Sequence, residues 1–162
     1  MGPMRKLAFV TFALATVGLV ALGARTPADD NNIGNWTLNV AKSKYDPGPA
    51  PRSQTLKIEA WGDDGVKYTS DGIDADGKPT HSEVEAKYDG KFYPFKGNPD
   101  SDMLAYKRID VNTLHMTSQL GGKQNVTGMI VISKDGKTRT LTQVGTNAKG
   151  QKVNNVVVYE RQ

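Results

Sequence analysis

Residues 124–144 read QNVTGMIVISKDGKTRTLTQV, and this stretch decides the fold class. Before the central Asp135-Gly136, Ile130 and Ile132 occupy alternate positions, and after it Leu141 stands between two polar residues. Residues two apart point to the same face of a β-strand. Asp-Gly tolerates the positive φ angles that a tight hairpin turn needs. The stretch therefore predicts two antiparallel strands, at 124–133 and 138–144, joined by a hairpin.

The same pattern continues in both directions along the chain. Turn dipeptides recur at Asp76-Gly77, Asp89-Gly90 and Gly121-Gly122, and the segments between them alternate with period two rather than with a helical period. Turns of this kind join each strand to its neighbour. We therefore predict an all-β protein, an antiparallel up-and-down β-barrel of about 8–10 strands. The remaining strands are expected at residues 36–40, 55–60, 66–70, 83–88, 91–95, 103–109, 113–120 and 153–159.

The first 24 residues have the features of a signal peptide. Arg5 and Lys6 precede an uncharged apolar run over residues 7–22, and the small residues Gly23 and Ala24 follow it. The run is shorter than the roughly 20 residues of a membrane span, although an uncleaved N-terminal anchor is the alternative. We expect cleavage, a periplasmic or secreted location and no stable membrane insertion afterwards. The mature chain then has a flexible leader at 25–33 and a single barrel domain at 34–162.

Charge and cysteine content exclude several classes of function. Without Arg5 and Lys6, 19 of the 21 basic residues remain against 17 acidic ones, and the basic residues are scattered. We therefore expect no nucleic-acid partner. The chain has no cysteine, which excludes disulfides, a thiol nucleophile and a thiolate metal site. The expected form is a monomer.

The segment at residues 42–52 interrupts the strand pattern. Pro47, Pro49 and Pro51 remove three backbone donors and fix three φ angles, so this segment fits neither a helix nor the interior of a sheet. We interpret it as a semi-rigid, extended connection between the first two strands. A recognition role for the proline-rich tract is the alternative.

The two ends of the domain resemble a known family. The opening Gly34-Asn35-Trp36-Thr37-Leu38 resembles the Gly-x-Trp start of the calycin superfamily, the lipocalins and fatty-acid-binding proteins, here of a bacterial secreted type. The ending Val157-Val158-Tyr159-Glu160-Arg161 is similar to the last strand of fatty-acid-binding proteins. The resemblance implies that Trp36 plugs one end of the barrel and that Arg161 packs on its ring.

The chain also departs from that family in two places. At the position that Val157 occupies here, the resemblance implies an arginine that holds the carboxylate of a ligand. It assigns a helical lid to the connection between the first two strands, where residues 42–52 leave no room for one. The resemblance therefore implies a barrel without that carboxylate clamp and without that lid.

Strand parity selects the candidate ligand-binding residues. The apolar residues expected to face inward are Trp36, Leu38, Leu56, Ile58, Val66, Leu114, Met116, Ile130, Ile132, Leu141 and Tyr159. Tyr68, Ser118, Arg139, Gln143 and Asn155 share that parity. A few polar groups in an apolar lumen are typical of an oriented ligand site. The ligand-binding candidates are Tyr68, Tyr106, Met116, Arg139, Gln143 and Tyr159.

Arg139 is the most informative of these candidates. A buried guanidinium needs a partner, and it can bind a carboxylate through two parallel hydrogen bonds. The alternative register places Thr138, Thr140 and Thr142 inward and leaves Arg139 in water, because one leucine fixes the register of a strand only weakly.

Catalytic and metal-binding patterns give no site. Residues 72–77 with Glu83 approach the spacing of a calcium loop, but Gly72 occupies the first ligand position and no flanking helices are expected. His81 and His115 are the only histidines, too few for a zinc site, and no Gly-x-Ser-x-Gly nucleophile motif occurs. We expect no metal, no cofactor and no enzymatic activity.

Two functions fit these features. The first is an exported, lipocalin-like barrel that binds a small apolar or amphipathic ligand in its lumen. The second is a barrel filled by its own side chains, which acts through its surface as an envelope or inhibitor-type interaction module. An interior pocket below about 300 Å³ favours the second.

Overall fold

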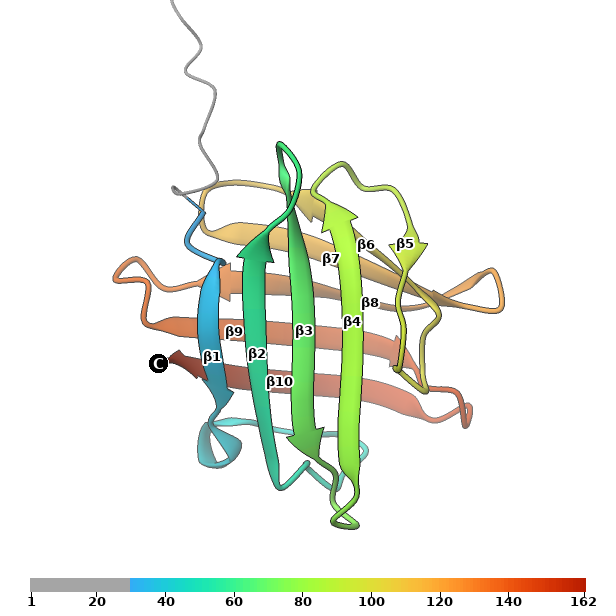
Figure 1. Cartoon of the computed structure of the whole chain (residues 1–162). Coiled ribbons are helices and arrows are strands. Elements are labelled where there is room, and N and C mark those ends of the chain that lie inside the picture. Colours follow the sequence, from blue (N-terminus) through green and yellow to red (C-terminus); the bar gives the residue numbers. More distant parts are fainter. Residues whose placement is uncertain (1–29) are drawn as a thin grey trace, which may run out of the picture.

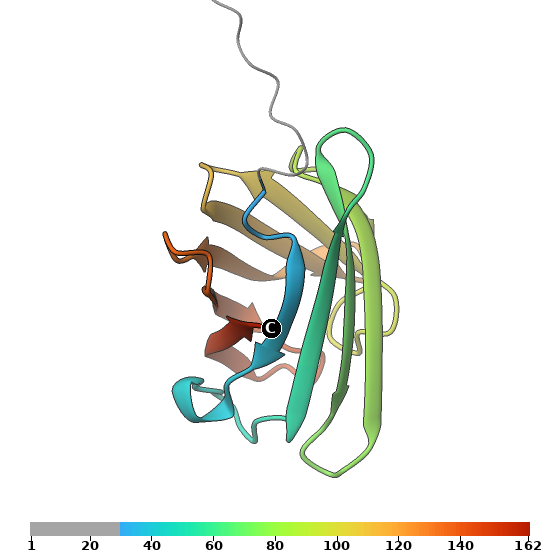
Figure 2. The same cartoon turned by 60° about the vertical axis from the view of Figure 1, so that its left-hand side comes forward.

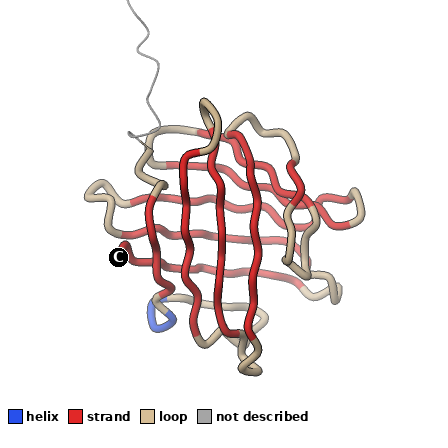
Figure 3. The backbone as a smooth tube through the Cα atoms, in the orientation of Figure 1, coloured by secondary structure: helices blue, strands red, loops and turns tan. Residues whose placement is uncertain are grey.

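The computed structural model describes residues 30–162, and this part of the chain consists of ten antiparallel strands and one short 3-10 turn. The signal peptide predicted at residues 1–24, and residues 25–29 of the expected leader, lie outside the described residues. Figures 1 and 3 show the strands, which are β1 (Gly34–Leu38), β2 (Ser53–Ala60), β3 (Gly65–Ile73), β4 (Pro79–Lys87), β5 (Tyr93–Pro94), β6 (Met103–Arg108), β7 (Thr113–Leu120), β8 (Lys123–Ile132), β9 (Thr138–Thr146) and β10 (Lys152–Arg161). The 3-10 turn η2 (Val40–Lys42) follows β1. No helix among residues 30–162 has the length and hydropathy of a membrane span.

The strands form one sheet in the order β4-β3-β2-β1-β10-β9-β8-β7-β6-β5. Except for β4 and β5, which form the two edges, each strand pairs with its neighbour in sequence, and β1 pairs with β10 so that Trp36 lies opposite Arg161. The sheet curls until its edges meet, where the backbones of Glu83 and Lys96 exchange hydrogen bonds of 3.0 and 2.9 Å. In Figures 1 and 2, β1–β4 cross over β6–β10 and the two layers enclose the interior. This nearly closed, up-and-down barrel confirms the predicted fold class.

The strand predictions differ most from the structure at 91–95. Only Tyr93–Pro94 is a strand there, because Gly90 adopts a φ of 78° and the backbone N–H of Lys91 donates to the Asp89 carboxylate at 3.0 Å. Turn hydrogen bonds thus replace ladder hydrogen bonds over the first part of the segment. By contrast, the strand predicted at 113–120 has the predicted bounds.

The core follows the period-two alternation. On β2, Leu56 and Ile58 are buried, while Lys57 and Glu59 point outward and form an ion pair at 2.8 Å. The same parity buries one face of every long strand, so the inward side chains of opposite layers meet in one continuous cluster. Of the apolar residues expected to face inward, all are buried except Leu141, which is half-buried.

Trp36 is buried where the first strand, the last strand and the segment preceding the first strand meet. Its ring is fully buried, its indole N–H donates to the carbonyl of Asn32 at 3.0 Å, and the Arg161 guanidinium lies 4.2 Å from the ring centroid. Arg161 also donates to the carbonyls of Asn31 and Ile33, at 2.6 and 2.7 Å. These contacts join the last strand to the segment that precedes the first strand.

Residues 30–33, which sequence analysis assigns to a flexible leader, are instead docked on the barrel. Asn32 is only 3% exposed, and its side-chain N–H donates to the Tyr88 hydroxyl at 3.2 Å. Asp30 accepts hydrogen bonds from Tyr88 at 2.7 Å and from Arg108 at 3.1 Å. The expectation of a loose leader rested on the lack of apolar residues, but buried polar side chains hold this segment in place.

The proline-rich connection begins along the edge of β10, beyond the end of β1. The backbones of Lys44 and Val156 exchange hydrogen bonds of 2.7 and 2.8 Å, and the Asp46 carbonyl accepts from Asn154 at 2.7 Å. Residues 45–52 belong to no strand or helix, which agrees with the connector interpretation. This path brings the side chain of Tyr45 to the interior of the barrel.

Candidate functional site

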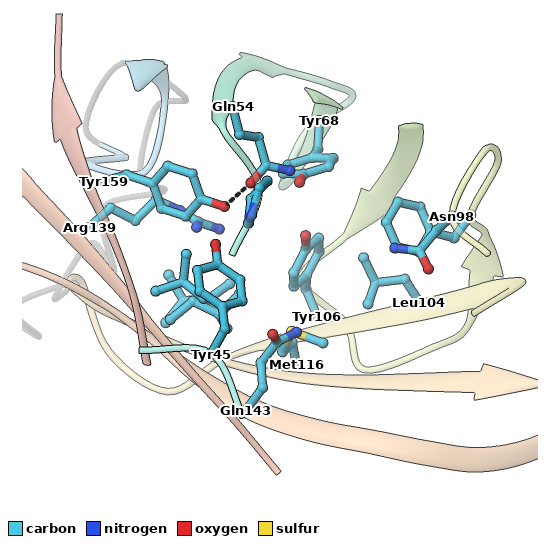
Figure 4. Close-up of a pocket in the computed structure, with 15 residues that line it drawn as sticks. Tyr45, Gln54, Tyr68, Asn98, Leu104, Tyr106, Met116, Arg139, Gln143 and Tyr159 are labelled. Atoms are coloured by element: carbon cyan, nitrogen blue, oxygen red, sulfur yellow. Dashed lines mark hydrogen bonds between the residues drawn. The ribbon is translucent and has the colours of Figure 1, made fainter. Parts of the chain in front are cut away.

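The interior of the barrel contains a cavity with two lobes. The volumes of the lobes are about 220 and about 160 Å³. Both lobes are lined by Phe95, Asn98, Leu104, Met116 and Gln143, so they lie next to each other. Figure 4 shows the side chains around the larger lobe.

All six ligand-binding candidates line the larger lobe. They come from five different strands and meet there because each occupies an inward position of its strand. They are Tyr68 on β3, Tyr106 on β6, Met116 on β7, Arg139 and Gln143 on β9, and Tyr159 on β10. Whether they bind a ligand is part of the proposal below.

Arg139 points into the barrel. It is only 2% exposed and lies opposite Ile132 on β8 and Tyr159 on β10. Thr138, Thr140 and Thr142 occupy the other face of β9, so the alternative register does not occur. The inward residues of the flanking strands fix the register that Leu141 alone leaves open.

Arg139 is held by neutral partners. Its Nε donates to the side-chain oxygen of Asn32 at 3.0 Å, and its guanidinium lies 5.6 Å from the centroid of the Tyr159 ring. None of the ion pairs formed by residues 30–162 includes Arg139. The nearby carboxylate of Asp30 is instead paired with Arg108 at 3.1 Å. The lumen thus contains a buried cation without a protein counter-ion in the described residues.

A chain of hydrogen bonds crosses the lumen beside Arg139. The Tyr159 hydroxyl donates to Gln54 Oε1 at 2.6 Å (Figure 4), and Gln54 Nε2 donates to the Ser70 hydroxyl at 2.7 Å. Gln143 Nε2 lies 3.9 Å from the Met116 sulfur, a weak contact that leaves its amide able to bind another group.

Among the polar residues of the site, sequence reasoning missed four. Gln54 has the same parity as Leu56 and Ile58, so extending the predicted strand by one residue finds it. Tyr45, Asn98 and Asn32 lie outside the strands, where no periodicity assigns a direction to a side chain. Tyr45 and Asn98 line the lumen, and Asn32 holds Arg139 from behind.

The lumen opens near the Pro-rich connection. A larger hollow of about 540 Å³ lies at this end of β3 and β4, and it shares Pro51, Gln54 and Asn98 with the interior lobe. Gly97, in the loop on the other side of this mouth, has a φ of 76°. A Cβ at Gly97 would collide with the carbonyl oxygen of His81, so this loop packs directly against β4.

The tyrosines of the lumen are neutral. Burial raises the pKa of Tyr45 to about 12. Burial also raises the pKa of Tyr68, Tyr106 and Tyr159 above the ordinary 10.0, although Arg139 opposes the shift in all three. At neutral pH these hydroxyls therefore carry protons, and none of them supplies a negative charge for Arg139.

This neutrality predicts an alkaline titration. The unfolded chain loses its tyrosine protons near the ordinary pKa of 10.0, before the folded chain does, so the free energy of unfolding should fall as the pH rises above about 10. In a titration to high pH, the phenolate absorbance near 295 nm should rise only above the ordinary tyrosine pKa of 10.0, at the same pH at which the circular dichroism of the sheet is lost. A phenolate transition of all tyrosines near pH 10 with an intact sheet would contradict the burial of these side chains.

In the described chain, the metal-binding patterns of the sequence do not correspond to a cluster of possible ligands. Residues 30–162 contain no group of three histidine, aspartate or glutamate side chains that could hold a metal ion. The calcium-like segment at 72–77 forms a hairpin end in which Asp74 accepts from the backbone N–H of Lys78 at 2.8 Å. His81 pairs with Asp71 at 2.7 Å, and His115 contacts Thr127 at 2.9 Å.

Comparison with solved structures identifies the type of barrel. A redesigned beta barrel superposes with a TM-score of 0.52 at 13% sequence identity, covering 86% of this chain and 99% of the other. The zebrafish ileal bile acid-binding protein in complex with cholic acid superposes with a TM-score of 0.51 at 14% identity, covering 82% and 99%. The fold is an antiparallel β-barrel of the kind found in these two proteins. This supports the fold implied by the resemblance of the two ends.

Sequence comparisons add nothing to this fold assignment. No model of a known protein family matches the chain. A search of curated proteins also finds no match. At identities of 13% and 14%, these two barrels establish the fold alone, so the function must be argued from the lumen itself.

Proposed function

We propose that this protein binds a small amphipathic molecule in the lumen of its barrel, with the polar end of the ligand at Arg139. The observation that carries the proposal is the position of Arg139, which is 2% exposed and borders a cavity in the interior. Desolvation of a charge is costly unless other groups compensate it. An arginine at this position is most easily explained by a ligand that interacts with it.

The composition of the cavity wall supports this function. Aromatic and aliphatic side chains supply apolar area, while Gln54, Gln143 and Arg139 supply a few polar groups that converge on the same space. Such a combination fixes both the burial and the orientation of a ligand. The barrel fold adds support, because a barrel of this type holds cholic acid in the zebrafish protein.

The size of the cavity limits the ligand. Each lobe, at about 220 and about 160 Å³, is smaller than the roughly 300 Å³ of sites for drug-sized molecules, so volume alone favours the filled barrel and restricts any luminal ligand to a small molecule. Val157 is buried in the wall of the larger lobe, at the position where the family resemblance implies an arginine clamp. We therefore favour a compact ligand over a long-chain fatty acid.

The proposal includes a location and a mode of action. We place the protein in the periplasm or outside the cell, on the signal-peptide features of residues 1–24. We also propose that it acts as a monomer and by binding alone, without converting its ligand. Binding of this kind is suited to storage, transport or scavenging of a small molecule.

Native mass spectrometry of protein purified from its own host tests the proposal. We expect an added small-molecule mass that is present under native conditions and lost on denaturation. A matched pair of variants locates the molecule. Gln143→Phe fills the lumen and should remove the added mass, whereas Val144→Phe, on the exposed face of the same strand, should retain it.

Two results would contradict luminal binding. One is an unliganded mass for the native protein together with no thermal stabilisation by a panel of fatty acids, retinoids, haem and aromatic acids. The other is an added mass that survives Gln143→Phe and disappears in Val144→Phe. Either result would favour the filled barrel that acts through its outer surface.

A further inference from the structure

The charge of Arg139 lacks an anionic partner, and the identity of its neighbour explains why. The residue that accepts the hydrogen bond from Arg139 is Asn32, an amide, at 3.0 Å. An aspartate of the same shape at this position would neutralise the guanidinium. Because residue 32 is an asparagine, the positive charge remains available to the cavity.

The hydrogen bonds of Asn32 also fix its orientation. Its side-chain N–H donates to the Tyr88 hydroxyl at 3.2 Å, so its oxygen must face Arg139. Tyr88 in turn donates to the carboxylate of Asp30 at 2.7 Å, and Arg108 pairs with that carboxylate at 3.1 Å. The cation that pairs with Asp30 is therefore Arg108, which also pairs with Asp64 at 3.2 Å, and the hydrogen bond of Arg139 goes to the neutral amide.

The walls beside Arg139 are aromatic. Tyr45, Tyr68, Phe95, Tyr106 and Tyr159 all line the larger lobe, and the rings of Tyr68 and Phe95 pack edge to face at 6.2 Å between centroids. In Figure 4 the rings of Tyr45, Tyr68, Tyr106 and Tyr159 surround the space into which Arg139 points. Flat ring faces and ring edges favour a planar aromatic ligand over a flexible alkyl chain.

We infer that the ligand is a compact aromatic acid, bound as its anion, and that the neutral Asn32 sets this preference for negative charge. The inference rests on the proposed function and specifies the class of molecule. The carboxylate accepts from the guanidinium of Arg139, the aromatic ring contacts the tyrosine walls, and the volume of about 220 Å³ for this lobe restricts the ring system. Asn32 acts here as a positioning and specificity-determining residue, without need for direct contact with the ligand.

Three probes of matched size or charge test the inference. They are 2-naphthoate, its neutral isostere 2-naphthamide, and the alkyl anion decanoate, each titrated into the protein by isothermal calorimetry at neutral pH. For the unmodified protein we expect 2-naphthoate to bind at least about 10-fold more tightly than either other probe, since 2-naphthamide loses a charge-assisted hydrogen bond to a buried arginine and decanoate loses the ring contacts with the tyrosine walls.

The variant Asn32→Asp then tests the role of the neutral amide. It should lower the affinity for 2-naphthoate at least about 10-fold, while the affinity for 2-naphthamide changes less than about 3-fold. The reason is that the new carboxylate competes with an anionic ligand for Arg139 but not with a neutral one. Asn31→Asp is the matched control. It adds the same charge one residue away, where the side chain contacts Asn112 instead of the lumen, and should leave both affinities unchanged.

Each other outcome overturns a defined part of the inference. Equal binding of 2-naphthoate and 2-naphthamide removes the preference for an anion, and tighter binding of decanoate removes the preference for an aromatic ring, while both leave luminal binding intact. An unchanged affinity for 2-naphthoate in Asn32→Asp, with the fold verified by circular dichroism, removes the role of Asn32. Failure of all three probes overturns the ligand class, and native mass spectrometry then decides separately whether the lumen binds another molecule.

Discussion

Replacing Trp36 with alanine should lower the free energy of unfolding by about 3–5 kcal/mol, the usual cost of truncating a large buried aromatic side chain. Trp36 is fully buried, and it connects the first strand, the last strand and the docked segment at residues 30–33. The substitution leaves a cavity at this junction and removes the surface on which Arg161 packs. Urea unfolding followed by circular dichroism measures the change.

Trp61→Ala is the matched control for this prediction. Trp61 lies in the loop between β2 and β3, is only half-buried, and contacts Tyr93 edge to face with ring centroids 6.4 Å apart. Its removal should cost about 0.5–1.5 kcal/mol. If Trp36→Ala does not fold, Trp36→Phe should fold with an intermediate loss. Equal and small losses for Trp36→Ala and Trp61→Ala would contradict the role of Trp36 as the barrel plug.

Replacing Arg139 with methionine should weaken binding of 2-naphthoate by about 2–5 kcal/mol, the usual effect of truncating one partner of a buried charged hydrogen bond. This corresponds to a loss of affinity of at least about 30-fold. The variant keeps an unbranched apolar stem but removes the only luminal cation of the larger lobe within the described chain. Calorimetric titration of the variant measures the effect.

The same variant should remain folded. Replacement of a buried, unpaired charge by an apolar side chain removes the desolvation cost of that charge, which stabilises the fold. The unsatisfied oxygen of Asn32 costs about 1–3 kcal/mol in the opposite direction, so the two effects offset each other. Thr140→Met, on the outer face of the same strand, is the control and should bind 2-naphthoate normally. Retention of full affinity in Arg139→Met would contradict an anion site at this residue.

The strands could be predicted from sequence because the barrel has one wet face and one buried face. Each inward Leu, Ile or Val then alternates with a polar residue, and Asp-Gly turns mark where strands end. The prediction fails at 91–95, where Asp89 competes for the backbone N–H of Lys91 at 3.0 Å. A side chain that replaces a ladder hydrogen bond leaves no trace in the alternation of apolar residues.

The site was only partly accessible to sequence reasoning. Parity places Tyr68, Arg139 and Gln143 on inward faces, because strand geometry fixes their direction once the register is known. It gives no information about Tyr45 or Asn98, which reach the lumen from irregular backbone. These two positions depend on tertiary packing of the connection and the mouth loop.

Asn32 illustrates the same limit for polar residues. A short polar segment before the first strand resembles any loose terminus. Its burial follows from three hydrogen bonds to residues 4, 56 and 107 positions away in sequence, namely Trp36, Tyr88 and Arg139. Only the folded barrel brings these partners together.

The central claim is that the lumen around Arg139 is a ligand site, and a crystal structure of the protein with 2-naphthoate tests it most directly. The account predicts density for the compound inside the barrel, with its carboxylate within hydrogen-bonding distance of the Arg139 guanidinium and its rings against Tyr68, Tyr106 and Tyr159. A structure at saturating 2-naphthoate in which the compound lies on the outer surface, or in which the lumen contains only water, would contradict it.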